Sequence, residues 1–317
     1  MPTPQPAKQV AASDYTHIEV KPLSAATGAE IRCGALQSID DATMREIYRA
    51  WLDHLVLLFR DQKITDPELI EFSKGFGPLE LAPLGAAGQK DRDARKYPEL
   101  HVVSNVKENG VPIGILGDGE AVWHTDMSSF LQPPTASFLY ALELPPSGGD
   151  TFFTNMYAAY DTLPEEMKRR LIGLTIKHDA LYNSAGQRNI PDPVRQPGTG
   201  ASHPIVCTHD ETGFNALYLG RRANTYINEL PRAESDELLE YLWKHATQPQ
   251  LVWRHTWRLG DVIVWDNRCV MHYREAFDPN ARRILHRTQA QGTVPPFTAD
   301  DALQRPPHPR ARMTQTA

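Results

Sequence analysis

Short segments that alternate between apolar and polar residues dominate this chain of 317 residues, and helical spacing is confined to a few stretches. Between residues 100 and 156, strand patterns follow one another in LHVVSNV, AVWHTDMSSF, TASFLYALEL and GDTFFTNM. Strand patterns return further along the chain in HPIVCTHD, NALYLG, LVWRHTWRLGDVIVWDN and RRILHRTQAQG. We therefore expect a mainly β fold with peripheral helices, in which two sheets form a barrel or jelly roll.

Four segments have apolar positions at helical spacing. Residues 38–54 place acidic residues after a serine, which is typical of a capped helix. In residues 64–77, Asp66 is the expected cap and Pro67 lies in the first turn. The remaining two segments are residues 156–174, expected to form one helix, and residues 233–248.

The middle of the chain shows no change in composition that would mark a domain boundary. We expect one domain over residues 15–296, with disordered tails at residues 1–14 and 297–317, which are rich in proline and polar residues. Residues 81–97 and 184–203 have the Gly, Pro or charge content of irregular loops, and the second could be a lid.

The charge balance argues against two classes of partner. The chain has 33 Lys and Arg against 39 Asp and Glu, a net charge of -6, so neither a nucleic-acid nor an anionic membrane surface is expected. The three cysteines are scattered without a CxxC pair and fit a reducing compartment. No apolar run has the length of a membrane span or the form of a signal peptide. We expect a cytoplasmic protein that could form a homo-oligomer.

The stretch VWHTDMSSF places His124 and Asp126 two positions apart among strand-forming residues. Positions i and i+2 of a strand face the same side, so both side chains would project together. A single H-x-D occurs often by chance at a polar sheet edge, but GDVIVWDNRCVMHYREAF adds an apolar strand, a turn and then His272. Two imidazoles and one carboxylate are the facial triad of iron(II) oxygenases. The same residue types also occur in zinc hydrolases, and a non-catalytic jelly-roll binding module is a third alternative.

Three further residues could bind anions. Thr151 in PPSGGDTFF begins a strand and offers a hydroxyl that can donate to a carboxylate. In RRILHRT, Arg283 and Arg287 would share one side of a strand with Leu285 between them. A buried guanidinium is costly unless an anion pairs with it, so we favour an anion-binding role over an exposed basic edge.

Five motifs in this order, WHTD, PPSGGDT, MYAAYDTLP, GDVIVWDNRCVMHY and ARRILHRT, resemble the taurine/2,4-dichlorophenoxyacetate family of iron(II)- and 2-oxoglutarate-dependent dioxygenases. The resemblance extends from FRDQKITDPELIEFSKGFGPLE to HRTQAQG and implies a double-stranded β-helix inside a jelly roll. It implies that His124, Asp126 and His272 bind the iron. It also implies that Thr151 and Arg283 hold the distal carboxylate of 2-oxoglutarate.

The resemblance further implies that the enzyme uses O2 to hydroxylate a small organic anion, whose product could collapse and cleave an ether or C–S bond. Arg287 would lie on the substrate side, with Trp123 as an aromatic neighbour, and Lys96 is another candidate for the substrate. Arg221 and Arg222 could also meet an anion. We favour an aryloxyalkanoate such as 2,4-dichlorophenoxyacetate, because PPSGGDTFF, HATQ and WDNRCVMH resemble the phenoxyacetate branch more closely and LAPLG offers an apolar wall for a ring. Taurine, other alkylsulfonates and alkyl sulfates are the alternatives. The segment LAPLGAAGQKD has no basic residue in its first nine positions, where a phenoxyacetate site would be expected to use one.

Overall fold

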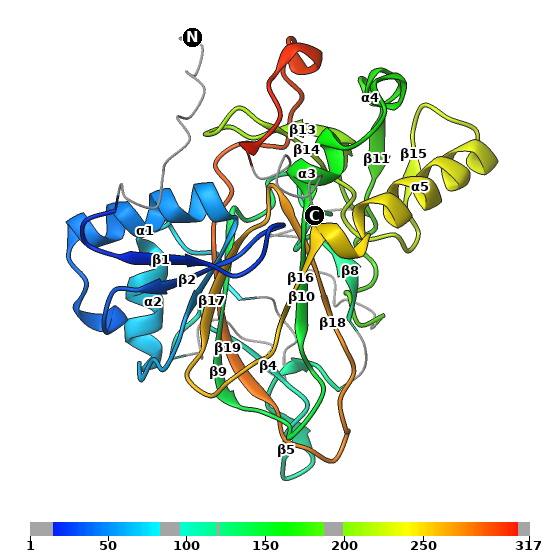
Figure 1. The fold of residues 1–317 in the computed structure, drawn as a ribbon. Helices are drawn as coiled ribbons and strands as arrows, with labels where there is room; N and C mark the ends of the chain where they lie inside the picture. The colour runs from blue at the N-terminus through cyan, green and yellow to red at the C-terminus, as the bar shows by residue number, and fades with distance from the viewer. Residues whose placement is uncertain (1–14, 83–95, 119–120, 187–198, 310–317) are drawn as a thin grey trace.

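The computed structural model describes residues 15–82, 96–118, 121–186 and 199–309. Two β-sheets dominate it, and the helices lie outside them (Figure 1). The prediction of a mainly β fold with peripheral helices is confirmed. The two sheets pack against each other and hold a small set of buried polar side chains between them.

The larger sheet has eight strands among the described residues. Neighbouring strands pair antiparallel, except for β2 with β3 and β4 with β7, which pair parallel. In spatial order the strands are β1 (Glu19–Pro22), β2 (Ala29–Arg32), β3 (Val56–Phe59), β17 (Val262–Asp266), β9 (Ala136–Glu143), β19 (Ile284–Ala290), β4 (His101–Ser104) and β7 (Ile115–Leu116).

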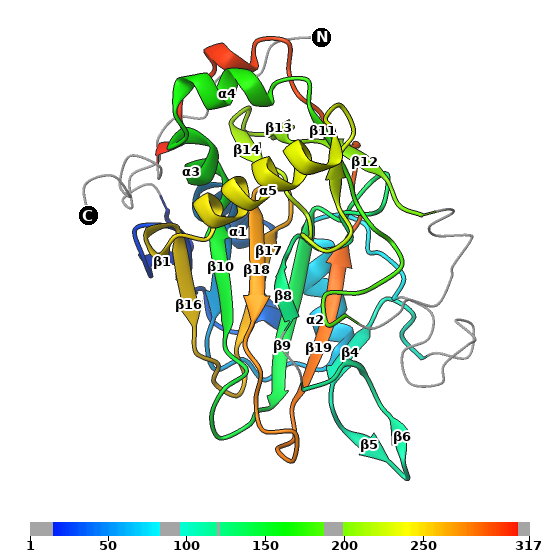
Figure 2. The same ribbon diagram turned by 90° about the vertical axis from the view of Figure 1, so that its right-hand side faces the viewer.

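The smaller sheet has four antiparallel strands, which face the viewer in Figure 2. In spatial order they are β16 (Val252–His255), β10 (Thr151–Asn155), β18 (Val270–Arg274) and β8 (Ala121–His124). The register places Phe153, His272 and His124 in one row across β10, β18 and β8. A neighbouring row places Thr151 opposite Arg274.

Three minor sheets and five helices complete the described fold. The minor sheets join β12 (Ser202–Pro204), β11 (Thr175–Lys177) and β15 (Tyr226–Ile227); β13 (Val206–Thr208) and β14 (Asn215–Leu217); and β5 (Lys107–Glu108) and β6 (Val111–Pro112). The helices are α1 (Asp41–His54), α2 (Asp66–Lys74), α3 (Met156–Asp161), α4 (Glu165–Leu171) and α5 (Arg232–Ala246). Short 3-10 turns occur at Leu36–Ser38, Pro249–Leu251 and Ala302–Gln304.

The larger sheet is buried on both faces, because its strands send successive side chains to opposite sides. On β3, Leu57 packs with Trp51 of α1 and Leu69 of α2. Its neighbour Leu58 belongs to the other apolar cluster, which contains Phe153 of the smaller sheet. Helices α1 and α2 therefore cover the outer face, and the smaller sheet packs on the inner face (Figure 1).

All four segments predicted to be helical contain helices, but two details of these predictions are wrong. The expected cap Asp66 is wrong: Thr65 is the N-cap of α2, in a capping box with Glu68. The single helix expected over residues 156–174 is also wrong, because α3 and α4 are separate and Pro164 lies between them. Proline disfavours helical backbone at the preceding residue, so the helix cannot run through this point.

The C-terminal boundary predicted at residue 296 lies too early, because residues 297–309 pack on the body of the protein. The Thr208 backbone N–H donates to Phe297 O at 2.7 Å, and the His308 ring stacks on Tyr157 with 4.5 Å between ring centroids. The predicted tail at residues 1–14 and residues 310–317 lie outside the described residues. Most of the two predicted loops lies outside them as well, including residues 187–198 of the candidate lid.

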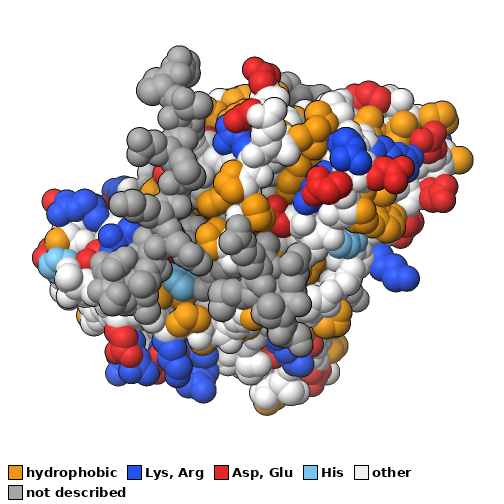
Figure 3. Space-filling model, turned by 45° about the horizontal axis from the view of Figure 1, so that its top comes forward, with side chains coloured by type: hydrophobic (Ala, Val, Ile, Leu, Met, Phe, Trp, Pro, Cys, Tyr) orange, Lys and Arg blue, Asp and Glu red, His pale blue; other side chains and the backbone are white. Residues whose placement is uncertain are grey.

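The surface agrees with the charge balance of the sequence. On the face shown in Figure 3, basic and acidic side chains are interspersed, and no single-sign patch stands out. Within the part of the chain that the structure describes, no helix has the length and apolar character needed to cross a membrane.

Candidate active site

His124, Asp126 and His272 come together between the two sheets. His124 ends β8 and His272 lies directly opposite it on β18, so the two imidazoles meet across neighbouring strands. The H-x-D spacing predicted that Asp126 lies on the same strand as His124, and this prediction is wrong. Strand β8 ends at His124, and Asp126 lies in the turn that comes next, beside Met127 with its φ of 50°. The turn, and not strand alternation, brings the carboxylate back to the imidazoles.

The three side chains present their ligand atoms to one point. Asp126 Oδ1 lies 3.5 Å from His124 Nε2 and 3.8 Å from His272 Nε2. All three residues are buried, and one ligand atom from each lies within 4.8 Å of the other two. Ligands bound cis to one another on an octahedral ion, at about 2.1 Å, lie about 3 Å apart. The cluster therefore fits a divalent ion after a small contraction.

The protonation of the cluster also suits a cation. Burial alone would raise the pKa of Asp126, but Arg287, His272 and His124 hold it well below its usual range. Burial, and then the neighbouring His124, lowers the pKa of His272 well below its usual range. His124 Nδ1 lies 2.6 Å from Val122 O, which leaves Nε2 as its lone-pair nitrogen. Asp126 and His272 thus favour the deprotonated forms that metal binding requires.

Residues that the sequence did not single out surround the second oxygen of Asp126. The Ser137 hydroxyl donates to Asp126 Oδ2 at 2.8 Å. Ser137 in turn contacts Asn267 and Gln289, at 2.8 Å and 3.0 Å. One signal was visible in advance, since Ser137 is a small polar residue at an inward position of the apolar strand TASFLYALEL.

Thr151 and Arg283, the residues expected to hold 2-oxoglutarate, are both buried and lie at the same end of the site. Trp257 Nε1 donates to Thr151 Oγ1 at 3.0 Å, and an indole can only donate, so the threonine proton stays available for an acceptor. The side chain of Arg283 donates to Gly149 O at 3.3 Å, and its Nε has no partner among the described residues. Burial, and then the nearby Arg274, lowers the pKa of Arg283 to about 9.

Arg287 pairs with a carboxylate of the protein, although the sequence analysis predicted that it binds the substrate. Its Nη2 donates to Asp126 Oδ2, and it contacts Ser137 Oγ at 3.3 Å. A neutral substrate would therefore not leave this guanidinium without a counter-ion. The Arg287 Nε atom nevertheless has no partner among the described residues. Part of its donor fork is thus uncommitted.

Trp123 lies on the other face of the smaller sheet from His124, because the two are consecutive on β8. Its ring stacks on Tyr273 with 5.6 Å between ring centroids, so the structure does not bring it to His124, Asp126 and His272. Lys96 is exposed and lies over its neighbour Tyr97.

The paired arginines of LYLGRRAN are committed to protein carboxylates. Arg221 pairs with Asp179 at 3.1 Å. Arg222 pairs with Asp236 and with Glu240, at 3.0 Å and 2.9 Å. Neither contact points to a role with substrate.

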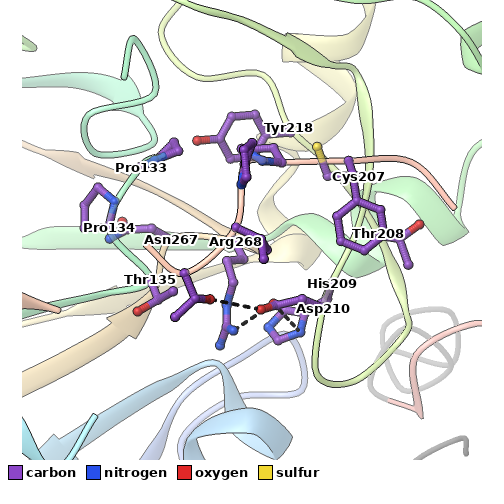
Figure 4. Close-up of a pocket in the computed structure, with 15 residues that line it drawn as sticks. Pro133, Pro134, Thr135, Cys207, Thr208, His209, Asp210, Tyr218, Asn267 and Arg268 are labelled. Carbon is purple, nitrogen blue, oxygen red and sulfur yellow. Dashed lines mark hydrogen bonds and ion pairs between the residues drawn. The ribbon is translucent and has the colours of Figure 1, made fainter. Parts of the chain in front are cut away.

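A second buried group, His209, Asp266 and Cys269, has the residue types of a metal site. His209 Nε2 contacts Asp266 at 3.0 Å, and its Nδ1 accepts from two backbone N–H groups. Arg268 donates to both oxygens of Asp266. These contacts occupy the imidazole nitrogens and both carboxylate oxygens, so His209 and Asp266 belong to a structural network with Arg268. Figure 4 shows His209, Arg268 and Asp210 beside a pocket that Pro133, Pro134 and Tyr218 also line.

Comparison with known proteins decides between the alternatives. Residues 19–289 match the model of the family described as taurine catabolism dioxygenase TauD, TfdA family. The chain belongs to this family. The alpha-ketoglutarate-dependent 2,4-dichlorophenoxyacetate dioxygenase of Burkholderia sp. (strain RASC) is 40% identical over 276 residues, which cover 81% of this chain and 89% of that protein.

Two solved structures agree. A taurine dioxygenase from Burkholderia xenovorans has a TM-score of 0.72 at 32% identity, covering 90% of this chain and 94% of that one. AAD-2 in complex with Mn(II) and N-oxalylglycine has a TM-score of 0.73 at 30% identity, covering 89% of this chain and all of that one. The chain is a 2-oxoglutarate-dependent dioxygenase that uses iron(II) and O2. A zinc hydrolase and a non-catalytic binding module are thereby rejected.

Proposed function

We propose that this TauD/TfdA-family enzyme hydroxylates a small organic anion, and that its substrate is an aryloxyalkanoate such as 2,4-dichlorophenoxyacetate. The observation that carries the proposal is the position of two buried arginines on β19 and just before it. Arg283 and Arg287 lie four residues apart, about 13 Å along an extended chain, and Arg287 touches the candidate metal ligand Asp126. Arg283 has an unpartnered Nε among the described residues and suits the co-substrate, whereas Arg287 is paired with Asp126 and would reach a substrate anion through its remaining donors.

In this proposal His124, Asp126 and His272 bind iron(II), and Thr151 and Arg283 hold the distal carboxylate of 2-oxoglutarate. Bound iron(II), with 2-oxoglutarate and O2, supplies the oxidising power to hydroxylate an unactivated C–H bond, leaving succinate and CO2. The side chains of the protein hold the metal and 2-oxoglutarate in place. The burial of these five residues and of Arg287 keeps bulk water away and strengthens the contacts of both arginines with anions.

Arg287 can recognise the substrate without releasing Asp126. Its Nη2 is committed to Asp126 and Ser137, while its Nε is buried without a partner among the described residues. A guanidinium carries five N–H donors in a planar fork, so one edge can hold Asp126 while another donates to a substrate carboxylate. The substrate anion would thus sit beside the metal ligands.

The proposed product depends on which carbon is hydroxylated. One oxygen atom of O2 enters the C–H bond next to the ether oxygen, and the other leaves in succinate. The resulting hemiacetal loses its hydroxyl proton and breaks the C–O bond to the aryloxy group, which departs as the phenol. From an aryloxyacetate the second product is glyoxylate. Taurine, alkylsulfonates and alkyl sulfates would collapse by the same logic, but the phenoxyacetate-dioxygenase relative is 40% identical and the taurine-dioxygenase structure 32%.

We also propose that the two sheets form the double-stranded β-helix implied by the resemblance, within one domain that begins near residue 15. Leu139 of β9 and Leu285 of β19 share one apolar cluster with Met271 of β18, which supports this proposal. The three cysteines are free, which fits the cytoplasmic location that we infer.

The proposal is tested with a panel of aryloxyalkanoates, alkylsulfonates and alkyl sulfates, scored by substrate-dependent succinate release. We expect the aryloxyalkanoates to have the highest kcat/KM. Arg287→Leu should lower the preference for each acid over its primary amide by about 30-fold or more, the cost of removing one partner of a buried charge pair. Arg282→Leu is the matched control, because Arg282 is exposed and pairs with Glu143. A best substrate without charge, or an acid-to-amide preference that Arg287→Leu leaves intact, contradicts the proposal.

A further inference from the structure

The hydrogen bonds around Asp126 have a direction that can be worked out from the chemistry of the partners. Trp265 Nε1 donates to Asn267 Oδ1 at 3.0 Å. An indole nitrogen has no acceptor capacity, so this contact fixes the carbonyl side of the Asn267 amide. The NH2 group of Asn267 must then be the end that donates to Ser137 Oγ, at 2.8 Å.

Ser137 is left with one way to point its proton. Its oxygen is surrounded by three donors that cannot accept its proton: Asn267 Nδ2, Gln289 Nε2 at 3.0 Å and, at a longer 3.3 Å, Arg287 Nη2. The single hydroxyl proton is therefore directed to Asp126 Oδ2, 2.8 Å away. Ser137 is fully buried, so no bulk water competes for this proton.

The strand register holds this arrangement in place. Ser137 lies on β9 directly between Gln289 of β19 and Trp265 of β17. It faces the smaller sheet, because its neighbour Phe138 packs on the helix side. The donor that acts on Asp126 is thus fixed by main-chain pairing on both sides.

We propose that Ser137 is a positioning residue that keeps Asp126 bound to the metal through one oxygen. The hydroxyl and Arg287 together occupy Oδ2, and Oδ1 alone faces the two imidazoles. If Oδ2 were released, the carboxylate could rotate and take a second coordination position, one that 2-oxoglutarate or O2 requires. The inference rests on the proposal that Asp126 is a metal ligand.

Ser137→Ala tests the inference through metal affinity, measured by Mn(II) titration of the purified, metal-free protein. Loss of a partner behind a metal ligand typically weakens binding 10- to 100-fold, and we expect a loss of about that size. Ser73→Ala is the matched control. Ser73 is equally buried and bonded to Leu69 O and Thr288, but it lies on the helix side of the larger sheet. Its Mn(II) affinity should equal that of the wild type.

A second variant guards against misfolding and separates positioning from packing. Asn267→Ala leaves the Ser137 hydroxyl but removes the donor that orients it, so it should weaken Mn(II) binding by a smaller factor. The double variant should bind no more weakly than Ser137→Ala alone, because both changes act through one hydrogen bond. Additive losses, or an Mn(II) affinity of Ser137→Ala within threefold of Ser73→Ala, overturn the inference.

Two outcomes distinguish this inference from the metal site itself. If His124→Ala abolishes Mn(II) binding while Ser137→Ala binds normally, only the role of Ser137 is wrong. If His124→Ala also binds normally, the assignment of the ligands fails. The anaerobic charge-transfer band of iron(II) with 2-oxoglutarate gives an independent reading, since a carboxylate that binds through both oxygens should weaken or shift it.

Discussion

Replacing Arg283 by methionine should stabilise the protein in the absence of 2-oxoglutarate. Arg283 is 2% exposed, its guanidinium donates to Gly149 O, and its Nε has no partner among the described residues. Burial, and then Arg274, lowers its pKa to about 9. A buried cation without a counter-ion opposes folding, and an apolar side chain of similar length avoids that cost.

The size and the pH dependence of the effect can be worked out from that pKa. This lowered pKa means that burial disfavours the charged guanidinium, relative to its neutral form, by a few kcal/mol in the folded state, at about 1.36 kcal/mol per unit. Lost packing and relaxation reduce the net effect, so we expect Arg283→Met to raise the free energy of unfolding by about 1–4 kcal/mol at neutral pH. The folded state binds the proton less tightly than the unfolded state. The wild type therefore gains stability as the pH rises above about 9, and the advantage of the variant shrinks there.

The same change should damage co-substrate binding. Removing one partner of a buried ion pair costs about 2–5 kcal/mol, which is a rise of roughly 30- to 4000-fold in the KM for 2-oxoglutarate. Urea unfolding of the metal-free protein and initial rates of succinate release measure the two effects. Arg282→Met is the control, because its exposed ion pair with Glu143 should matter little to either. A variant that is less stable than the wild type and keeps its KM would refute the reasoning.

Two further predictions concern the buried histidines and carboxylates. His124→Ala, Asp126→Ala and His272→Ala should each abolish succinate release while circular dichroism shows an intact fold; near-normal turnover in any iron-loaded variant contradicts the ligand assignment. His209→Ala should lower the free energy of unfolding by about 1–3 kcal/mol, because it removes a buried hydrogen bond to Asp266. Its kcat per folded molecule should be unchanged, and a selective loss of activity would show that this network is not purely structural.

The sequence predicted the strands well because their apolar residues alternate or run continuously over short lengths. It predicted His272 for the same reason, since a buried strand and a turn-like DNR precede it. The position of Asp126 came from a wrong premise. The H-x-D spacing implied one strand, but β8 ends at His124 and a turn with a positive φ at Met127 carries the carboxylate.

Pairings between distant segments were beyond a reading of local pattern. Arg287 and Asp126 are 161 residues apart, and the sequence around each of them gives no indication of their contact. Ser137 is one serine in an apolar strand, and its meaning depends on the register of β9 with two other strands. Pro164, by contrast, is a local signal, and it is sufficient to divide the helix predicted over residues 156–174.

Residues 297–309 pack on the protein, although their composition predicted a disordered tail. His308 is buried and stacks on Tyr157, and its backbone N–H donates to Asp161 at 2.7 Å. An aromatic contact of this kind contributes about 0.5–1.5 kcal/mol beyond the area it buries, so His308→Ala should lower the free energy of unfolding by about 1–3 kcal/mol. The control His17→Ala changes an exposed histidine and should have no measurable effect. Equal urea midpoints for both variants and the wild type would mean that this segment does not hold its place in solution.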